Sequence, residues 1–308
     1  MAIGQRLRHV VESQQFSREL LEEVFERADQ IAAEPHRAAG RLQGRVMAAL
    51  FYEPSTRTRL SFESAMLRLG GRTMGTDNAR EFSSAAKGET LEDTIRIISG
   101  YSDVIVLRHN EEGAARRAAA VSEVPIINAG DGKGQHPTQA LLDVYTIRAE
   151  LGRLDGVRVA MVGDLANGRT VRSLAYLLSK YRDVNVFFVA PPQVGMREDI
   201  KAHLDEHQVR WFEEASLEAV LPQVDVVYQT RIQKERFERP EDYEAVRGVY
   251  RIGLREMELL PRAAIVMHPL PRVDEIDPAV DADPRAAYFR QAKNGVQIRM
   301  ALLDMLLA

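Results

Sequence analysis

Short apolar runs rich in β-branched residues alternate with amphipathic segments from one end of this 308-residue chain to the other. Such alternation is typical of βα units around a mostly parallel sheet, so it places the chain in the α/β class. The expected strands are residues 45–52, 72–76, 103–107, 125–129, 157–163, 184–190, 224–230 and 264–268. Because single hydrophobic cores rarely grow beyond about 250–300 residues, we expect two domains with a site between them.

Two further segments predict how the domains are joined. Residues 137–151 carry apolar side chains at helical spacing between the two groups of strands, which predicts a connecting helix. Residues 284–307 predict a C-terminal helix that returns to the first domain. The expected fold is therefore two domains, each a mostly parallel sheet flanked by helices. Residues 1–150, with about 285–308 packing back on them, form the first domain, and residues 151–284 form the second.

Composition excludes several classes of protein. The net charge is −4 and the 41 basic residues are scattered, so no basic patch points to nucleic acid. The chain has no cysteine, which excludes disulfides, a thiolate nucleophile and a cysteine-ligated zinc site. The N-terminal residues lack the apolar core of a signal peptide, and no stretch approaches the roughly 18 apolar residues of a membrane span. We therefore expect a cytoplasmic protein with no nucleic-acid or membrane partner.

The segment after the first expected strand predicts an anion site. It reads Glu53-Pro54-Ser55-Thr56-Arg57-Thr58-Arg59 and opens a helical pattern that Ser55 is suited to cap. Arg57 and Arg59 would then lie in the first turn, where the helix dipole disfavours cations. A phosphate would compensate them, each charge-assisted hydrogen bond being worth about 1.5–3 kcal/mol. The alternative is a solvated helix start whose arginines pair with Glu53 or Glu63.

The chain resembles the aspartate/ornithine transcarbamylase family at this segment and at further motifs in the same order. The matching segments are Ser55–Arg59, Lys87–Thr90, Leu107–His109, Gly130–Gly132, Gln135–Gln139, Gly168–Thr170, Thr230–Arg236 and His268–Arg272. The resemblance covers nearly the whole chain. It implies transfer of the carbamoyl group of carbamoyl phosphate to an amino acid by direct attack of the amino group, with no covalent intermediate, metal or cofactor.

The resemblance also implies a set of residues for carbamoyl phosphate. The phosphate would be held by Ser55, Thr56, Arg57 and Thr58, and by Ser83 and Lys87 of a neighbouring subunit. The carbonyl oxygen would be surrounded by Thr58, Arg108 and His136, and the amide by Gln139, the Leu270 carbonyl and the turn at Pro271. Attack on the carbonyl carbon drives negative charge onto its oxygen, so fixed donors there lower the barrier. The catalytic residues expected are Arg57, Thr58, Lys87, Arg108 and His136.

His136 taken alone is a weak signal. A His-Pro pair before a helix is common, with proline at the first helical position and histidine near the cap. A metal role is weaker still, because no second histidine or paired carboxylate stands at ligand spacing from it.

Charge distinguishes the two acceptors of the family. Aspartate carries two carboxylates, which arginines bind through paired hydrogen bonds. The resemblance implies an aspartate pocket made by Lys87, Arg169, Arg231 and Gln233. Ornithine enzymes carry His-Cys-Leu-Pro where this chain has His268-Pro269-Leu270-Pro271, so we expect L-aspartate and an early step of de novo pyrimidine biosynthesis. Glu53 is expected to reach Arg169 and Arg236 when the domains close.

The resemblance further implies a homotrimer with shared active sites, and separate regulatory or dihydroorotase chains are possible partners. Three alternatives stay open. A dehydrogenase is prompted by residues 159–168, although their glycines have the wrong spacing for a dinucleotide fingerprint. The others are a non-catalytic relative that binds an anion and a transcarbamylase for another amino acid.

Overall fold

The computed structural model describes residues 7–76, 88–232, 239–244 and 246–308. The chain divides into two units, the first running to Leu141 and including Asn294–Ala308, the second spanning Leu142–Lys293. Two helices, α7 (Pro137–Leu151) and α13 (Tyr288–Leu307), run from one unit into the other. The α/β class and the two parallel sheets flanked by helices are confirmed, as are the connecting and returning helices.

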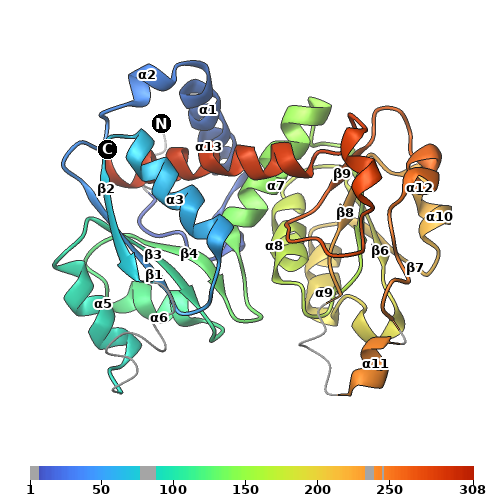
Figure 1. Cartoon of the computed structure of the whole chain (residues 1–308), viewed down its shortest axis with the longest axis horizontal. Coiled ribbons are helices and arrows are strands. Elements are labelled where there is room, and N and C mark those ends of the chain that lie inside the picture. Colours follow the sequence, from blue (N-terminus) through green and yellow to red (C-terminus); the bar gives the residue numbers. More distant parts are fainter. Residues whose placement is uncertain (1–6, 77–87, 233–238, 245) are drawn as a thin grey trace. The chain divides into compact units, whose positions relative to one another are not determined.

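The first unit is built on a four-stranded parallel sheet in the order β2-β1-β3-β4. Its strands are β1 (Val46–Phe51), β2 (Arg72–Thr76), β3 (Val104–His109) and β4 (Ile126–Asp131). Its helices are α1 (Arg18–Ala33), α2 (Pro35–Ala38), α3 (Thr56–Arg68), α5 (Leu91–Ser99) and α6 (Ala114–Val121), with a 3-10 turn η1 (Ser13–Gln15). Figure 1 shows α5 and α6 on one face of this sheet, where Leu50, Ile95 and Ile105 share one buried cluster.

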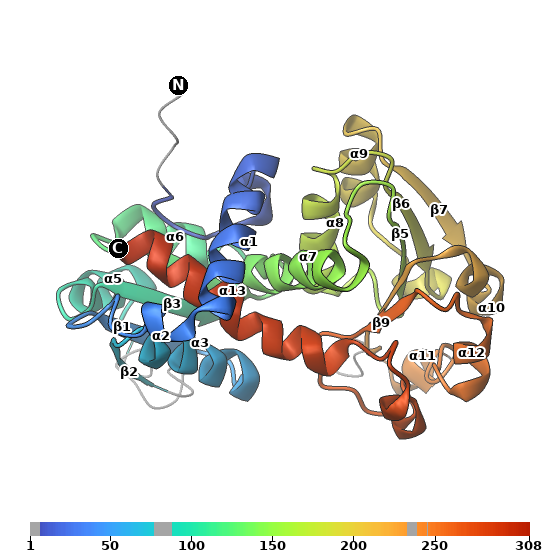
Figure 2. The same ribbon diagram turned by 90° about the horizontal axis from the view of Figure 1, so that it is seen from above.

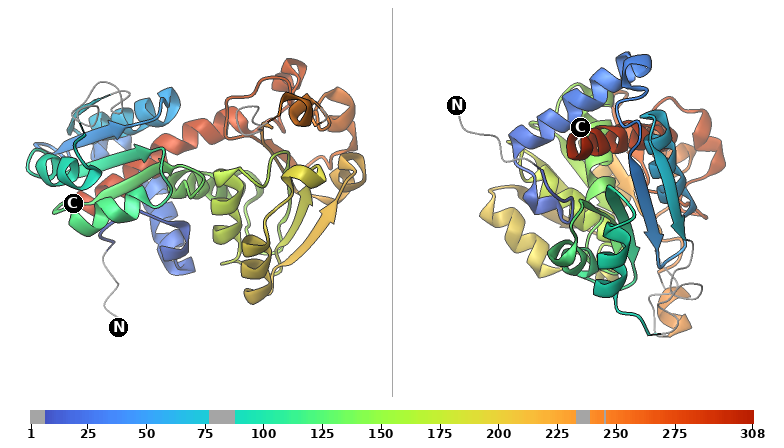
Figure 3. Two further views of the ribbon diagram at one scale, coloured as in Figure 1. Left: turned by 90° about the horizontal axis from the view of Figure 1, so that it is seen from below. Right: turned by 90° about the vertical axis from the view of Figure 1, so that its left-hand side faces the viewer.

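The C-terminal part of α13 belongs to the first unit because its polar and apolar contacts lie there. Asp304 is 1% exposed and forms ion pairs with Arg41 at 2.6 Å and with Arg27 of α1 at 3.2 Å. The guanidinium of Arg299 lies over the ring of Phe62 in α3, 5.0 Å from its centroid. The end of α13 therefore lies beside α1 (Figure 3).

The second unit contains a five-stranded parallel sheet in the order β7-β6-β5-β8-β9. Its strands are β5 (Arg158–Val162), β6 (Asn185–Val189), β7 (Arg210–Glu214), β8 (Val226–Gln229) and β9 (Ile265–Met267). Its helices are α8 (Arg169–Leu178), α9 (Glu198–Glu206), α10 (Leu217–Val220), α11 (Pro240–Glu244) and α12 (Leu254–Leu259). Short 3-10 turns lie at η3 (Pro192–Val194), η4 (Leu221–Gln223) and η6 (Pro278–Ala282). Figure 2 shows α8 and α9 on one face of this sheet and α10 and α12 on the other.

Two differences from the expected elements have local causes. Strand β7 was not predicted, because it is an edge strand that pairs only with β6 among the described strands and carries exposed Arg210 and Glu213. Helix α13 starts at Tyr288 rather than 284, because the preceding residues bond to β9 instead. The Val266 N–H donates to the Arg285 carbonyl and the Ala287 N–H donates to the Val266 carbonyl, both at 2.8 Å. None of the described helices combines the length and apolar character that crossing a membrane requires.

Candidate active site

The start of α3 presents an unbalanced positive charge. Ser55 occupies the N-cap position as expected, but its side chain makes no capping hydrogen bond, and the first turn contains no acidic residue. Arg59 forms an ion pair with Glu63, 2.7 Å between Nε and Oε1, as the solvated alternative expects for both arginines. Arg57 has no such partner among the described residues, and partial removal from water lowers its pKa. One arginine of the motif is thus available to an anion.

Thr58 lies in the first turn of α3, and Arg108 lies on β3, the strand beside β1. Thr58 is buried, three residues into the helix region that follows β1. Arg108 lies at the end of β3, where it pairs with Phe51 of β1 in the parallel register. Its Nη1 donates to the carbonyl of Ala129 on β4 at 3.3 Å, and its Nη2 lies 3.3 Å from Oε2 of Glu53. The arginine is therefore held at the carboxyl edge of the sheet by β4 and by the segment that follows β1.

His136 is buried where the chain passes from β4 into α7. Its carbonyl accepts hydrogen bonds from the N–H groups of Gln139 at 3.0 Å and Ala140 at 3.1 Å. His136 therefore lies directly before the first turn of α7, near the cap, as the sequence predicts. Asp131 shapes the preceding loop: one oxygen accepts from the Gln135 N–H and the other from the Gly113 N–H, at 2.8 and 2.9 Å. His136 and Gln139 thus share the strand edge that carries Arg108 in the first unit.

In the second unit Arg169 is the first residue of α8, at the carboxyl end of β5. The loop before it is fixed by Asp164, which is fully buried and whose carboxylate accepts the Asn167 N–H at 3.0 Å. Gly168 allows the tight approach, because a Cβ there would lie 2.6 Å from the Asp164 carbonyl oxygen. As in α3, the first turn of α8 contains no acidic residue, and an arginine again lies where the dipole is positive.

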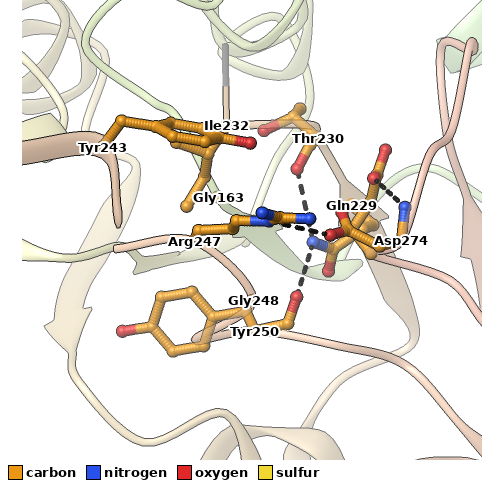
Figure 4. Close-up of a pocket in the computed structure, with 10 residues that line it drawn as sticks. Gly163, Gln229, Thr230, Ile232, Tyr243, Arg247, Gly248, Tyr250 and Asp274 are labelled. Carbon is orange, nitrogen blue, oxygen red and sulfur yellow. Dashed lines mark hydrogen bonds and ion pairs between the residues drawn. The ribbon is translucent and has the colours of Figure 1, made fainter. Parts of the chain in front are cut away.

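Arg231 follows β8, the strand beside β5. The Thr230 hydroxyl donates to the Val162 carbonyl at 2.8 Å, and Gly163 lies so close that a Cβ would be 2.4 Å from the Thr230 carbonyl oxygen. A pocket opens at this strand end, lined by Thr230, Ile232, Tyr243, Arg247 and Asp274 among others (Figure 4).

The loop after β9 carries Leu270 and Pro271, which are joined by a cis peptide bond. Leu270 has a positive φ of 56°, and its N–H donates to Nδ1 of His268 at 2.7 Å. Since Nδ1 accepts, the proton of the neutral imidazole is on Nε2, which donates to Oε1 of Glu275 at 2.7 Å. The second oxygen of Glu275 accepts from the Val273 N–H at 3.0 Å. The Leu270 carbonyl thus lies in a loop that hydrogen bonds to His268 and Glu275 hold in place.

A buried network extends from this loop to two helices. The His268 N–H donates to Gln291 of α13 at 2.9 Å, and the Gln291 amide donates to Asp143 of α7 at 2.7 Å. The Tyr228 hydroxyl of β8 donates to the other oxygen of Asp143, also at 2.7 Å. Sequence reasoning missed Asp143 and Gln291, because partners 148 positions apart leave no local pattern. Of the expected site residues, Ser83, Lys87, Gln233 and Arg236 lie outside the described residues.

Each unit thus gathers polar side chains and a helix start at the carboxyl ends of parallel strands, the arrangement of an α/β protein that binds small anionic ligands. Two domain models match the chain. The carbamoyl-phosphate-binding domain of aspartate/ornithine carbamoyltransferases matches residues 8–149, and the Asp/Orn-binding domain of the same enzymes matches residues 155–306. The chain belongs to the aspartate/ornithine carbamoyltransferase family.

Relatives and solved structures narrow the similarity to the aspartate branch. A chloroplastic aspartate carbamoyltransferase of Oryza sativa is 61% identical over 100% of this chain and 87% of its own length. The solved catalytic subunit of aspartate transcarbamoylase from Methanocaldococcus jannaschii is 49% identical, covers 97% of this chain and 98% of its own, and has a TM-score of 0.90. Aspartate transcarbamoylase of Trypanosoma cruzi, in complex with N-(phosphonacetyl)-L-aspartic acid, is 43% identical, covers 98% of this chain and 96% of its own, and has a TM-score of 0.92.

These relatives correct one expectation. The sequence led us to expect a cytoplasmic protein, and this is wrong, because relatives 61–62% identical from Oryza sativa, Pisum sativum and Arabidopsis thaliana are named as chloroplastic. The argument failed because a chain without cysteine fits any reducing compartment, so it could not distinguish one such compartment from another.

Proposed function

We propose that this chain transfers the carbamoyl group of carbamoyl phosphate to the α-amino group of L-aspartate, giving N-carbamoyl-L-aspartate and phosphate. This is an early step of de novo pyrimidine biosynthesis. Relatives that are 49–62% identical over nearly the full length and are named aspartate carbamoyltransferases support the activity. The structural observation that carries it is the start of α3, where Arg57 has no acidic partner among the described residues.

The first unit supplies the donor site of this proposal. The phosphate of carbamoyl phosphate binds the hydroxyls of Ser55, Thr56 and Thr58 and the guanidinium of Arg57, with the backbone N–H groups of the helix start. Arg108 and His136, with Thr58, donate to the carbonyl oxygen. The contacts of Arg108 with the Ala129 carbonyl and Glu53 favour this role, because a donor that is already fixed needs no reorganisation as charge develops.

The second unit supplies the acceptor site. Arg169 and Arg231 bind the two carboxylates of aspartate, and Gln233 assists near its amino group. The absence of acidic residues from the first turn of α8 supports an anion beside Arg169. The carbonyl of Leu270 accepts from the carbamoyl NH₂ group, and Gln139 assists as a second acceptor. We assign carbamoyl phosphate to residues 1–150 with about 285–308, and aspartate to residues 151–284.

The reaction needs orientation and charge stabilisation rather than a covalent intermediate. The neutral α-amino group attacks the carbonyl carbon, and negative charge grows on the oxygen that faces Arg108, His136 and Thr58. The tetrahedral intermediate then expels phosphate, which takes the proton from the nitrogen. Holding both reactants in place can supply about 7–11 kcal/mol, and each oxyanion donor about 2.7–4 kcal/mol.

The assembly belongs to the same proposal. Three copies form a trimer in which Ser83 and Lys87 of one subunit complete the site of its neighbour, where Lys87 binds both substrates. Separate regulatory or dihydroorotase chains are possible additional partners. The catalytic-subunit name of the Methanocaldococcus jannaschii relative supports an enzyme that works with other chains.

One assay tests the activity. Purified protein is incubated with carbamoyl phosphate and either L-aspartate or L-ornithine, and the carbamoyl amino acid is measured colorimetrically. We expect product with aspartate and none with ornithine. Product with ornithine alone would move the chain to the other branch of the family, and no product with either, from protein that binds phosphate, would favour a non-catalytic relative.

A further inference from the structure

Two histidines and a glutamate gather at the C-terminal end of α9, a helix that carries none of the candidate active-site residues. His203 and His207 are one helical turn apart, with ring centroids separated by 4.1 Å. One nitrogen of each imidazole and a carboxylate oxygen of Glu206 all lie within 4.8 Å of one another. The three side chains therefore project from the same end of one helix.

Hydrogen bonds fix which nitrogen of His203 carries its proton. The Ser179 hydroxyl donates to the Tyr176 carbonyl at 2.9 Å, so its oxygen is left to accept. Nε2 of His203 lies 3.0 Å from that oxygen and is therefore the N–H donor. The lone pair of His203 is consequently on Nδ1.

The tautomer of His207 is fixed in the same way. Its Nδ1 lies 2.8 Å from the carbonyl oxygen of His203, which can only accept a hydrogen bond. Nδ1 therefore carries the proton and the lone pair is on Nε2. Each imidazole thus uses one nitrogen to donate to a protein oxygen and keeps a lone pair on the other, the arrangement that metal-binding histidines adopt.

Charge and backbone geometry at this helix end also suit a cation. The helix closes at Gln208, whose φ is 58°, and the Val209 N–H donates to the Leu204 carbonyl at 2.9 Å. The C-terminal end of a helix carries partial negative charge, which favours a bound cation.

We propose that His203, Glu206 and His207 bind a divalent transition-metal ion such as Zn²⁺, through Nδ1, a carboxylate oxygen and Nε2, with water as a fourth ligand. Tetrahedral Zn²⁺ holds its nitrogen ligands at about 2.0–2.1 Å, which places neighbouring donor atoms roughly 3.4 Å apart. Glu206 is exposed and can rotate to close the remaining distance, while His207 keeps its hydrogen bond to the His203 carbonyl. Two imidazoles and a carboxylate within about one turn of helix match the donor set that Zn²⁺ prefers.

Isothermal titration of the chelator-treated full chain with Zn²⁺ tests the site, with tetrahedral Co²⁺ absorption as a second readout. We expect one ion per chain, and weakening of at least about tenfold in His203→Gln and in His207→Gln. Ser179→Ala should weaken binding about 10–100-fold, the usual effect of removing the partner of a ligating histidine. His36→Gln is the matched control, an exposed histidine of α2.

The outcomes separate a built site from surface binding. Zn²⁺ affinity that is unchanged in His203→Gln and His207→Gln overturns the proposal, as does an equal loss in His36→Gln. Thermal melts of each variant without metal show whether it is folded. If a histidine variant unfolds, Glu206→Gln and Ser179→Ala decide, because both leave the two imidazoles in place, and unchanged Zn²⁺ affinity in both overturns the proposal.

Discussion

Glu53 and Arg108 form an ion pair at the carboxyl edge of the first sheet, with 3.3 Å between Oε2 and Nη2. Their side chains are 28% and 13% exposed, so the pair is partly shielded from solvent. In the proposed reaction Arg108 donates to the carbonyl oxygen of carbamoyl phosphate, and it would then have two negatively charged neighbours. Glu53 is therefore placed to share the arginine with the donor substrate.

Glu53→Ala distinguishes this local role from the domain-closure role in which Glu53 reaches Arg169 and Arg236. If closure is its main role, the KM for aspartate should rise by roughly tenfold, about 1.4 kcal/mol, while the dissociation constant of carbamoyl phosphate changes much less. Steady-state kinetics and direct titration measure the two quantities. Equal effects on both substrates would rule out the closure role and leave Arg108 as the partner that matters.

Arg57→Ala should lower kcat/KM by about 10²–10³-fold, because the phosphate loses its charged donor at the helix start. Arg57→Lys should recover only part of this, since a point charge replaces a planar fork. Arg59→Ala is the matched control on the same helix. It removes the ion pair with Glu63, worth about 0.3–0.5 kcal/mol, and should leave kcat/KM within about threefold. Equal losses in both alanine variants would contradict the assignment of Arg57.

Asp143→Asn should weaken both stability and catalysis. Asp143 accepts from Tyr228 and Gln291, and an amide in its place would point an NH₂ group at one of these donors, costing about 1–3 kcal/mol. Because Gln291 also holds His268, the Leu270 loop should shift and kcat should fall. Urea unfolding and steady-state kinetics measure the two effects. Thr146→Val removes another buried hydrogen bond from α7 and should leave kcat unchanged. A normal kcat in Asp143→Asn would show that Asp143 does not position the Leu270 loop.

The contribution of Glu275 to stability should depend on pH. Burial by itself would raise its pKa, but the hydrogen bonds from His268 and the Val273 N–H lower it below the ordinary 4.5. The folded chain therefore binds this proton more weakly than the unfolded chain. The stabilisation is complete above about pH 4.5 and is lost as the pH falls through the folded-state pKa.

Urea unfolding of the natural chain and of Glu275→Gln between about pH 3 and 7 measures this contribution. The difference in unfolding free energy should be largest near neutral pH and should shrink below about pH 4.5. A difference that stays constant over this range would show that the carboxylate charge is not what stabilises the loop.

Shared sites predict complementation between inactive chains. Lys87→Ala and Arg57→Ala should each be nearly inactive alone, but mixed trimers would contain sites with one intact Lys87 and one intact Arg57. We expect a mixture, after subunit exchange, to regain a fraction of the natural activity. Exchange is verified by native mass spectrometry. Confirmed mixed trimers with no activity would contradict the sharing of sites.

The elements of the fold were predictable wherever burial shaped the local sequence. Strand β1 is apolar along its length, and β5 is apolar from Val159 onward, because helices cover both faces. Helix α7 begins and ends where its apolar spacing predicts. Strand β7 was missed because an exposed edge strand needs no apolar run. At the site, the helix start was predictable from Ser55. Which of Arg57 and Arg59 forms an ion pair depends on whether a carboxylate lies one turn away on the same face, as Glu63 does for Arg59.

Contacts between distant segments were beyond sequence reasoning. Nothing near Asp143 indicates that an amide 148 positions later will donate to it, and the partner of Arg108 depends on how β1 and β3 pair. The histidines of α9 were overlooked because their spacing gains meaning only when the surrounding hydrogen bonds fix the tautomers. Motifs therefore located the proposed active site, while the residues that position it emerged from the three-dimensional arrangement.

The placement of Asp304 has a consequence for synthesis of the chain. The first unit includes Asn294–Ala308, and Asp304 provides the buried carboxylate that pairs with Arg27 and Arg41. Translation proceeds from the N-terminus, so every residue of Leu142–Lys293 is made before that carboxylate exists. On the ribosome all residues of the second unit are therefore synthesised before those of the first unit are complete. The first unit can reach its final structure only after α13 has been made.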